Sequence, residues 1–285
     1  MNIPKFNLGE VVSSVRSVLP FGKAGQEGIL VIHLGGVIGY DDDEDSDFGR
    51  LCEILDELFV RLPKAVVMRV NCPGGSIAAS QEIFARIKSL RDQGVKIVAM
   101  MEDGVMSGGV YVCMAADKIV AHPGTVTGSI GVIFRGYEYS EILKFLKIRD
   151  ITIKSVPYKD IRSDKRRMSQ KERNLLQRLV LDAHDQFCQT IATSRNIEID
   201  TVKKFADGRI FTGNQAKDYG LIDEVGSFYD AIHLAGELAG IPEAERTHSV
   251  LRHNKSTIFS KLREALPFSR LESSFSGLPL WLMKR

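Results

Sequence analysis

From about Gly28 to Gly240, short apolar runs of strand length alternate with segments of helical periodicity, and this alternation constrains the fold most strongly. In the first half of the chain, the strand-like runs are Ile29–Leu34, Ala65–Val70 and Lys96–Met101. The stretches between them repeat apolar residues at the spacing of an amphipathic helix. Strands that are apolar on both sides and separated by helices are typical of parallel sheets covered on both faces. The sequence therefore predicts an α/β fold with a largely parallel sheet.

The alternation continues in the second half, where one long helix stands out. We expect strands at Lys118–His122 and Ile151–Val156, with a helix at Tyr139–Ile148 between them. Ser169 and Glu172 form a capping box that predicts the start of the long amphipathic helix, and a strand, a helix, a strand and a closing helix follow it. These patterns divide the chain into a flexible or amphipathic leader (1–27), one domain (28–240) and a C-terminal tail (241–285).

Composition and charge exclude several classes of function. The 285 residues have a formal net charge of +2, and no cluster of Lys and Arg is interleaved with aromatic residues, so we expect no nucleic-acid partner. The four cysteines show neither CxxC spacing nor neighbouring histidine pairs, which argues against a zinc site and a disulfide framework. No phosphate-binding glycine motif follows the first strand, and the acidic stretch 40–47 lacks the spacing of a calcium loop. We therefore expect neither a metal nor a cofactor.

Two glycine-rich turns follow successive predicted strands and are the first candidates for chemistry. One is NCPGGS at 71–76 and the other is EDGVMSGG at 102–109. Sites in parallel α/β sheets form where strand ends meet helix starts, because free backbone N–H groups gather there. Ser107 in such a turn is either a helix N-cap or a nucleophile. Its pairing with the Gly74–Gly75 turn favours the nucleophile, since glycine lets N–H groups approach a carbonyl and form an oxyanion hole.

A nucleophilic serine needs a base, and the residues by themselves leave its identity open. None of the six histidines stands in a recognisable triad order, and only His122 follows a strand end near the candidate site. Lys159 lies between a predicted strand and the long helix, flanked by Tyr158 and Asp160. As a base it would need its pKa lowered from about 10.4 towards ~8, which requires about 3 kcal/mol of differential desolvation. From local spacing alone, an ordinary surface lysine is the simpler interpretation.

Four motifs, in this order, resemble the signal peptide peptidase (SppA) family of serine–lysine peptidases. They are NCPGGS, MSGGVYVCMAADKIVAHPGTVTGSIGV, PYKDIRSD and ADGRIFTGNQAKDYGLIDEVG. The resemblance runs from about residue 29 to residue 240, nearly the whole predicted domain. It implies the ClpP/crotonase-like fold, built from repeated ββα units, and hydrolysis of peptide bonds.

The resemblance also implies roles for individual residues. Ser107 matches the family's nucleophile, Lys159 its general base, and Ser129 the serine that orients the lysine. Gly75, with the Gly108 N–H as a second donor, matches the oxyanion-hole region. The implied reaction proceeds through an acyl-enzyme.

An assembly and a substrate class follow from the same resemblance. The single SGG turn and the single YKD loop match the short form of the family, in which the serine and lysine of one site come from adjacent protomers of a ring. We therefore expect a homo-oligomer that acts on hydrophobic peptides, such as signal-peptide remnants or membrane-protein fragments. Gly74, Val105 and Met106 would line the substrate pocket. Met106 and Cys72 depart from the small residues that are common in the family at these positions.

Two other functions fit the same fold. A crotonase-like acyl-CoA enzyme would use carboxylates beside the oxyanion hole and would not need Ser107 or Lys159. A non-catalytic oligomeric scaffold would bind peptides or membrane proteins without cutting them. The family usually has an N-terminal membrane helix, whereas no run in this sequence approaches the ~20 apolar residues that span a bilayer. A membrane-associated and a cytoplasmic location in a prokaryotic cell therefore both stay open, with a membrane surface as a further candidate partner.

Overall fold

A mixed sheet of eight strands lies at the centre of the computed structural model, which describes residues 28–39, 47–246 and 248–250. The strands are β1 (Ile29–Ile38), β2 (Ala65–Gly75), β3 (Lys96–Met106), β4 (Lys118–Ala121), β5 (Val126–Gly128), β6 (Ile210–Thr212), β7 (Glu224–Val225) and β8 (His248–Val250). Their order is β6-β5-β3-β2-β1-β8, with β4 paired to β3 and β7. Every pair is parallel except β5–β6. The predicted α/β fold with a largely parallel sheet is confirmed.

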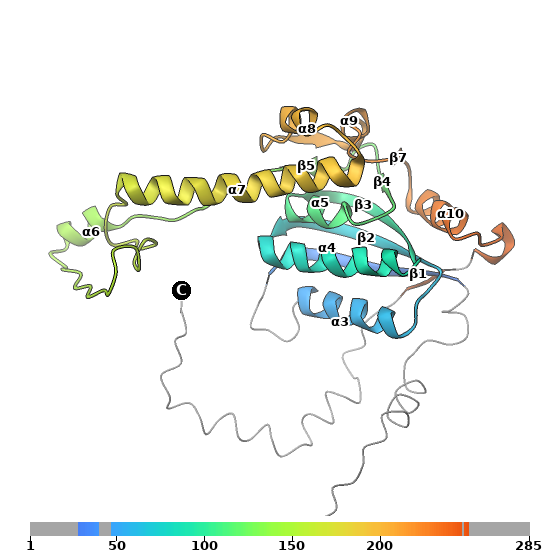
Figure 1. Cartoon of the computed structure of the whole chain (residues 1–285), viewed down its shortest axis with the longest axis horizontal. Helices are drawn as coiled ribbons and strands as arrows, with labels where there is room; N and C mark the ends of the chain where they lie inside the picture. Colours follow the sequence, from blue (N-terminus) through green and yellow to red (C-terminus); the bar gives the residue numbers. More distant parts are fainter. Residues whose placement is uncertain (1–27, 40–46, 247, 251–285) are drawn as a thin grey trace, which may run out of the picture. The chain divides into compact units, whose positions relative to one another are not determined.

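Helices cover both faces of this sheet (Figure 1). They are α3 (Asp47–Val60), α4 (Ile77–Asp92), α5 (Gly108–Cys113), α6 (Ser140–Phe145), α7 (Gln170–Arg195), α8 (Ile199–Phe205), α9 (Gly213–Asp218) and α10 (Phe228–Leu238), followed by a short 3₁₀ turn at Glu243–Glu245. Because successive strand residues point to opposite faces, Leu30 and Ile32 join one core cluster while Ile29 and Val31 join the other. The strands are apolar on both sides for this reason.

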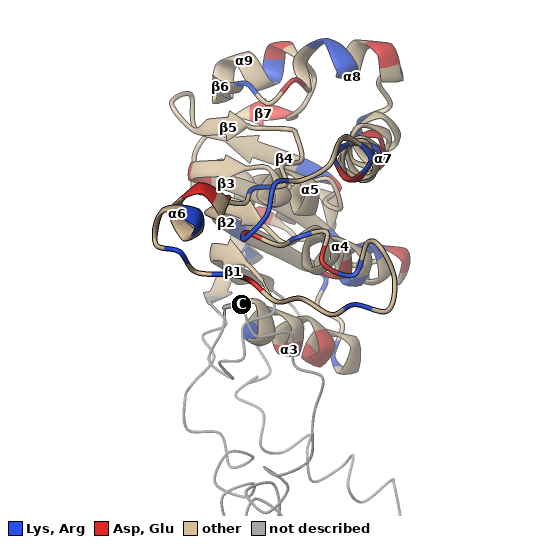
Figure 2. Cartoon of the chain, turned by 90° about the vertical axis from the view of Figure 1, so that its left-hand side faces the viewer, with Lys and Arg blue, Asp and Glu red and all other residues tan. Residues whose placement is uncertain are grey.

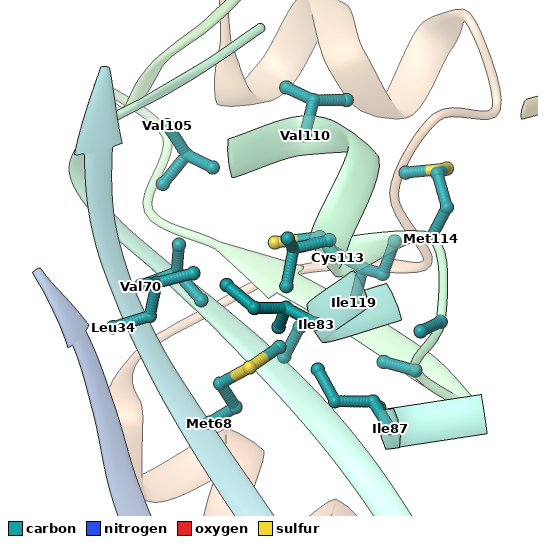
Figure 3. Close-up of a cluster of buried hydrophobic side chains, with 14 of the residues drawn as sticks. Leu34, Met68, Val70, Ile83, Ile87, Val105, Val110, Cys113, Met114 and Ile119 are labelled. Atoms are coloured by element: carbon teal, nitrogen blue, oxygen red, sulfur yellow. The ribbon is translucent and has the colours of Figure 1, made fainter. Parts of the chain in front are cut away.

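The larger core cluster lies between the sheet and α4 and α5, and it supports the turn that carries Ser107. Figure 3 shows Met68 and Val70 of β2, Ile83 of α4, and Val105 and Val110 on either side of the turn. Each of these side chains is buried, and burial of one such side chain stabilises the fold by about 1.5–3 kcal/mol. The turn is therefore fixed by the packed residues on both sides of it.

The long helix begins where the sequence predicts. The Ser169 N–H donates to Glu172 Oε2 (2.8 Å), and the Glu172 N–H donates to Ser169 Oγ (3.3 Å), which completes the capping box. The helix ends at Asn196, which adopts the left-handed conformation. At its N-terminal end, α7 carries a segment that contains α6 and lies away from the sheet (Figure 1). We call residues 133–168 the arm.

One predicted strand is wrong. Residues 151–156 form no strand; Ile151 and Ile153 are 85% and 96% exposed. The apolar alternation is present, but the segment belongs to the arm and pairs with none of the described strands. The sheet gains a strand elsewhere, because β8 falls in the predicted tail and pairs with β1.

The predicted leader and residues 251–285 of the predicted tail lie outside the described residues. Within the described ranges, no helix combines the length and the apolar character needed to cross a membrane.

Candidate active site

Ser107 lies in the turn between β3 and α5, in a backbone conformation that L-residues rarely adopt, with φ 50° and ψ −120°. Its N–H donates to the Gly128 carbonyl and its carbonyl accepts from the Tyr111 N–H, both at 3.0 Å. Although Ser107 holds the N-cap position of α5, its side chain makes no capping hydrogen bond. Such a conformation costs about 1–3 kcal/mol and occurs mostly at functional sites. A serine on a strained strand-to-helix turn is the arrangement that presents a nucleophile.

The glycine turn at the end of β2 lies directly against Ser107, as the sequence predicts. A Cβ added at Gly74 (φ +106°) would lie 2.7 Å from Ser107 Cβ and 2.9 Å from the Gly108 nitrogen. A Cβ added at Gly75 would lie 1.9 Å from the carbonyl oxygen of Ile38 in β1. Neither position has room for a side chain, so the close approach of the two turns requires glycine at both.

Gly108 brings a second backbone N–H to the same place. A Cβ added there would lie 3.3 Å from the Gly75 nitrogen and 2.4 Å from Ser80 Oγ. As the first residue of α5, Gly108 has an N–H without an acceptor inside the helix. The N–H groups of Gly75 and Gly108 thus lie close to each other beside Ser107, where an oxyanion hole needs its donors.

Ser129 follows the short strand that holds the Ser107 backbone. Met106 pairs with Gly128 at the ends of β3 and β5, so Ser107 and Ser129 are the first residues after these two adjacent strands. Ser129 also has a positive φ (49°), and its N–H donates to the Arg209 carbonyl (2.8 Å). The fold therefore brings Ser107 and the three predicted glycines together, and it places Ser129 one residue beyond the Gly128 carbonyl that holds Ser107.

A small cavity of about 30 Å³ opens beside Ser107 between α4, α5 and α7. Its lining comprises Gly75, Ile77, Ser80, Gln81, Ser107, Gly108, Tyr111, Gly131, Val132, Ala183 and Phe187. Gly74, Val105 and Met106, the predicted pocket residues, do not line it. Val105 is fully buried and points into the core instead (Figure 3). Their role in substrate binding stays a prediction.

Tyr111 and Phe187 also line this cavity, although they were not among the predicted site residues. The Tyr111 ring packs edge-on against Phe84 and Phe187, each at 5.3 Å between ring centroids. Its hydroxyl accepts a hydrogen bond from Thr190 Oγ1 (3.2 Å). In the sequence these aromatic residues have the helical spacing of ordinary core residues, so no local signal distinguishes them.

Lys159 is not brought to Ser107 within the chain. It is exposed on the arm, which Figure 1 draws at the N-terminal end of α7, away from α5. Within the part of the chain that the structure describes, no hydrogen bond or ion pair of its side chain is present. A site that combines Ser107 with Lys159 therefore needs a second copy of the chain to supply one of these residues.

Other titratable groups near the site do not offer a different chemistry. His122 is exposed and does not line the cavity. Burial raises the pKa of the Cys72 and Cys113 thiols, which keeps them protonated in the core. Across the described ranges, no three His, Cys, Asp or Glu side chains group together in a way that could hold a metal ion.

The mostly parallel sheet with helices on both faces places the chain in the ClpP/crotonase-like class of α/β folds. Sequence comparison then identifies the family. The profile described as "Peptidase family S49" matches residues 89–242, more than half of the chain, and the chain belongs to this family. The predicted resemblance to SppA peptidases is confirmed, and with it the assignment as a serine peptidase.

Three similar proteins illustrate the range of the family. "Putative protease slr0021" of Synechocystis is 38% identical over 235 residues, which cover 77% of this chain and 84% of that protein. "Putative signal peptide peptidase SppA" of Enterococcus faecium is 40% identical over 217 residues, covering 73% and 63%. "Protease 4" of Salmonella typhi is 31% identical over 218 residues, covering 75% and 35%. The chain thus spans less than two thirds of the last two relatives.

Proposed function

We propose that this peptidase is an endopeptidase for hydrophobic peptides in which Ser107 is the nucleophile and Lys159 the general base. The observation that carries the proposal is the strained turn at Ser107. Its side chain caps no helix. Gly74, Gly75 and Gly108 lie against it, and none of these three positions has room for a side chain. A fold stores strain of this kind where it serves a function.

The proposed reaction follows from these positions. The unprotonated Lys159 amine takes the proton of Ser107 Oγ as the oxygen attacks the scissile carbonyl, and the Gly75 and Gly108 N–H groups stabilise the oxyanion. When the tetrahedral intermediate collapses, the lysine ammonium gives its proton to the leaving amine. Water then attacks the acyl-enzyme as the lysine takes its proton, and the ammonium returns this proton to Ser107 Oγ as the carboxylic acid product leaves. Ser129, which follows β5 as Ser107 follows β3, would hold the amine in place.

The lining of the cavity supports a hydrophobic substrate. Most of its side chains are apolar or aromatic, among them Ile77, Val132 and Phe187. An apolar lining beside the nucleophile favours an apolar substrate side chain at this place. The name of the Enterococcus relative, a signal peptide peptidase, agrees with this substrate class.

We also propose that the active form is a homo-oligomeric ring in which the arm of one protomer carries Lys159 to Ser107 of its neighbour. Twelve of the 21 exposed large apolar side chains among the described residues lie on the arm. Ile153, Ile151 and Phe145 are the most exposed of them. Exposed apolar side chains concentrated in one segment favour a protein interface, and a repeated head-to-tail contact between copies gives a ring when its rotation closes. One contact would then bury these residues and complete the site.

Mixed assemblies of two inactive variants test both proposals. Ser107→Ala and Lys159→Ala, carrying different tags, are co-expressed and purified over both tags, and cleavage of a fluorogenic apolar peptide is measured. Each variant alone should be inactive but assembled by light scattering. If each site takes its serine and lysine from different chains, about a quarter of the sites in random hybrids are intact and activity returns to that level.

Three results would contradict these proposals. Activity of Ser107→Ala near that of the wild type excludes this nucleophile. Verified hybrids that stay inactive exclude a shared site. An assembled wild type that neither cleaves peptides nor reacts with a fluorophosphonate is a scaffold, or an acyl-CoA enzyme if it binds acyl-CoA.

A further inference from the structure

Arg166 joins the turn that carries Lys159 to the start of α7. On one side, its Nε donates to Asp160 Oδ2 (2.8 Å), and its Nη2 donates to Asp160 Oδ1 (2.9 Å) and to the Asp160 carbonyl (3.2 Å). On the other side, Nη1 and Nη2 donate to the two carboxylate oxygens of Glu172 at 3.0 and 2.5 Å. One guanidinium thus forms a fork with each of two carboxylates, a geometry that only arginine offers.

Glu172 makes this link rigid, because it belongs to the first turn of α7 and is 4% exposed. The same carboxylate accepts from the N–H and the hydroxyl of Ser169. Together with the Arg166 guanidinium, these donors lower the pKa of Glu172 to about 2. The charged network therefore persists at neutral pH, and a 26-residue helix anchors it.

The network also keeps Asp160 away from its neighbour in sequence, Lys159. Lys154 Nζ donates to Asp160 Oδ1 (2.6 Å) and to the Pro157 carbonyl (3.0 Å), so two cations hold this carboxylate. They hold the pKa of Asp160 well below its usual range. A carboxylate released beside a lysine would favour the ammonium form, which cannot act as a base. Lys and Arg are frequent along the loop between α6 and α7, which faces the viewer in Figure 2. Many cations therefore lie near Asp160, and Arg166 is distinguished from them by its paired hydrogen bonds to two carboxylates, not by its charge.

We propose that Arg166 is a positioning residue for the reaction: it fixes the Lys159 turn to α7 and keeps Asp160 paired, so that the lysine side chain is presented as an unpaired base. This inference rests on the proposed role of Lys159. It makes α7, which touches the cavity beside Ser107 through Ala183 and Phe187, the rigid element that also sets the position of the arm.

The first test compares Arg166→Gln with Arg167→Gln, a matched control whose side chain is 74% exposed and pairs with Glu141 at 3.3 Å. We expect Arg166→Gln to lower kcat about 100-fold, because misplacement of a catalytic group by about 1 Å has this effect, while KM changes less than about twofold. Arg166→Lys should recover part of the loss, since lysine pairs with one carboxylate but does not form both forks. Arg167→Gln should behave as the wild type. A wild-type kcat in Arg166→Gln, or an equal loss in the control, overturns the proposal.

Hybrid assemblies then show on which side of the site Arg166 acts. Arg166→Gln mixed with Ser107→Ala should regain activity, because the Ser107→Ala chain supplies an intact arm. Arg166→Gln mixed with Lys159→Ala should be no faster than Arg166→Gln alone, because every arm in the mixture is impaired. The opposite pattern overturns the proposal. Failure of Ser107→Ala and Lys159→Ala to complement each other is a separate result that contradicts the shared site and leaves the kcat test of Arg166 in force.

A second variant tests the same link in case Arg166→Gln does not fold. If Arg166→Gln does not assemble, Asp160→Asn breaks the same link from the other side while keeping the shape of the side chain. We expect its kcat to fall at least tenfold with KM nearly unchanged, because the neutral amide loses charge-assisted hydrogen bonds that fix the Lys159 turn. Unchanged kcat in assembled Asp160→Asn overturns the proposal.

Discussion

Replacing Gly108 by alanine should damage the protein in two separable ways, because the new methyl group meets two different neighbours. The first is Ser80 Oγ, which would lie 2.4 Å away, about 1 Å short of the 3.4 Å at which ordinary contact begins. Ser80 is buried, and its hydroxyl donates to the Ser76 carbonyl at 2.8 Å. The hydroxyl has to move and lose this bond. The second neighbour is the Gly75 nitrogen at 3.3 Å, in the proposed oxyanion hole.

The expected magnitudes follow from these contacts. Loss of the Ser80 hydrogen bond costs about 0.5–1.5 kcal/mol, and overpacking adds about 1–3 kcal/mol. Alanine has a higher helix propensity than glycine, which offsets up to about 1 kcal/mol of this loss of stability. Gly108→Ala should therefore lower the free energy of unfolding by about 0.5–4.5 kcal/mol. Obstruction of an oxyanion donor should lower kcat by about 100-fold or more.

A double variant separates the two effects. Ser80→Ala removes the clashing hydroxyl, so Gly108→Ala should cost little stability in that background, with a coupling energy of about 1.5–4.5 kcal/mol. Activity should not return, because the methyl group still lies beside the Gly75 nitrogen. Urea unfolding followed by circular dichroism at fixed protein concentration measures the first effect, and peptide cleavage measures the second. Additive changes in unfolding free energy would refute the packing argument, and recovery of activity together with stability would refute the oxyanion argument.

Three further changes test other parts of the structure. Hydrogen bonds lower the pKa of Glu172 from 4.5 to about 2, so its contribution to stability is present above pH 4.5 and is lost as the pH falls towards 2; in Glu172→Gln, the melting temperature should lose this part of its pH dependence. Asp223 accepts from Arg195 Nη1 (2.8 Å), Lys118 Nζ (3.0 Å) and a backbone N–H, so Asp223→Ala should cost about 3 kcal/mol in urea unfolding, and a loss below about 1 kcal/mol would contradict this role. Burial raises the pKa of Cys113, so iodoacetamide should modify it only after unfolding, as mass spectrometry can establish.

Much of the fold follows from the sequence because several local signals agree. The capping box at Ser169 and the apolar periodicity after it predict α7 at its correct start, and the glycine turns mark the ends of β2 and β3. The arm shows where such signals fail. Ile151 and Ile153 alternate with polar residues as in a strand, yet no described strand lies beside them. A pattern records that apolar residues share a face, not which surface covers that face.

The site divides in the same way. Ser107 and the neighbouring glycines could be predicted because two turns that approach each other closely require glycine, which is visible in the sequence as a motif. The structure brings these residues together. The contribution of Arg166 could not be predicted, because it depends on contacts with Asp160 and Glu172, each six residues away in the sequence. Many other basic residues lie in the same segment, and the sequence does not distinguish Arg166 from them. Tyr111 and Phe187 likewise become site residues only through the packing of α5 against α7.

The most direct test of the central claim is the site and the rate of modification by a fluorophosphonate, mapped by peptide mass spectrometry. The proposed mechanism predicts a single adduct on Ser107 of the assembled wild type, no adduct in Ser107→Ala, and labelling slowed by several orders of magnitude in Lys159→Ala. An adduct on a different serine, or an unchanged labelling rate in assembled Lys159→Ala, would contradict it.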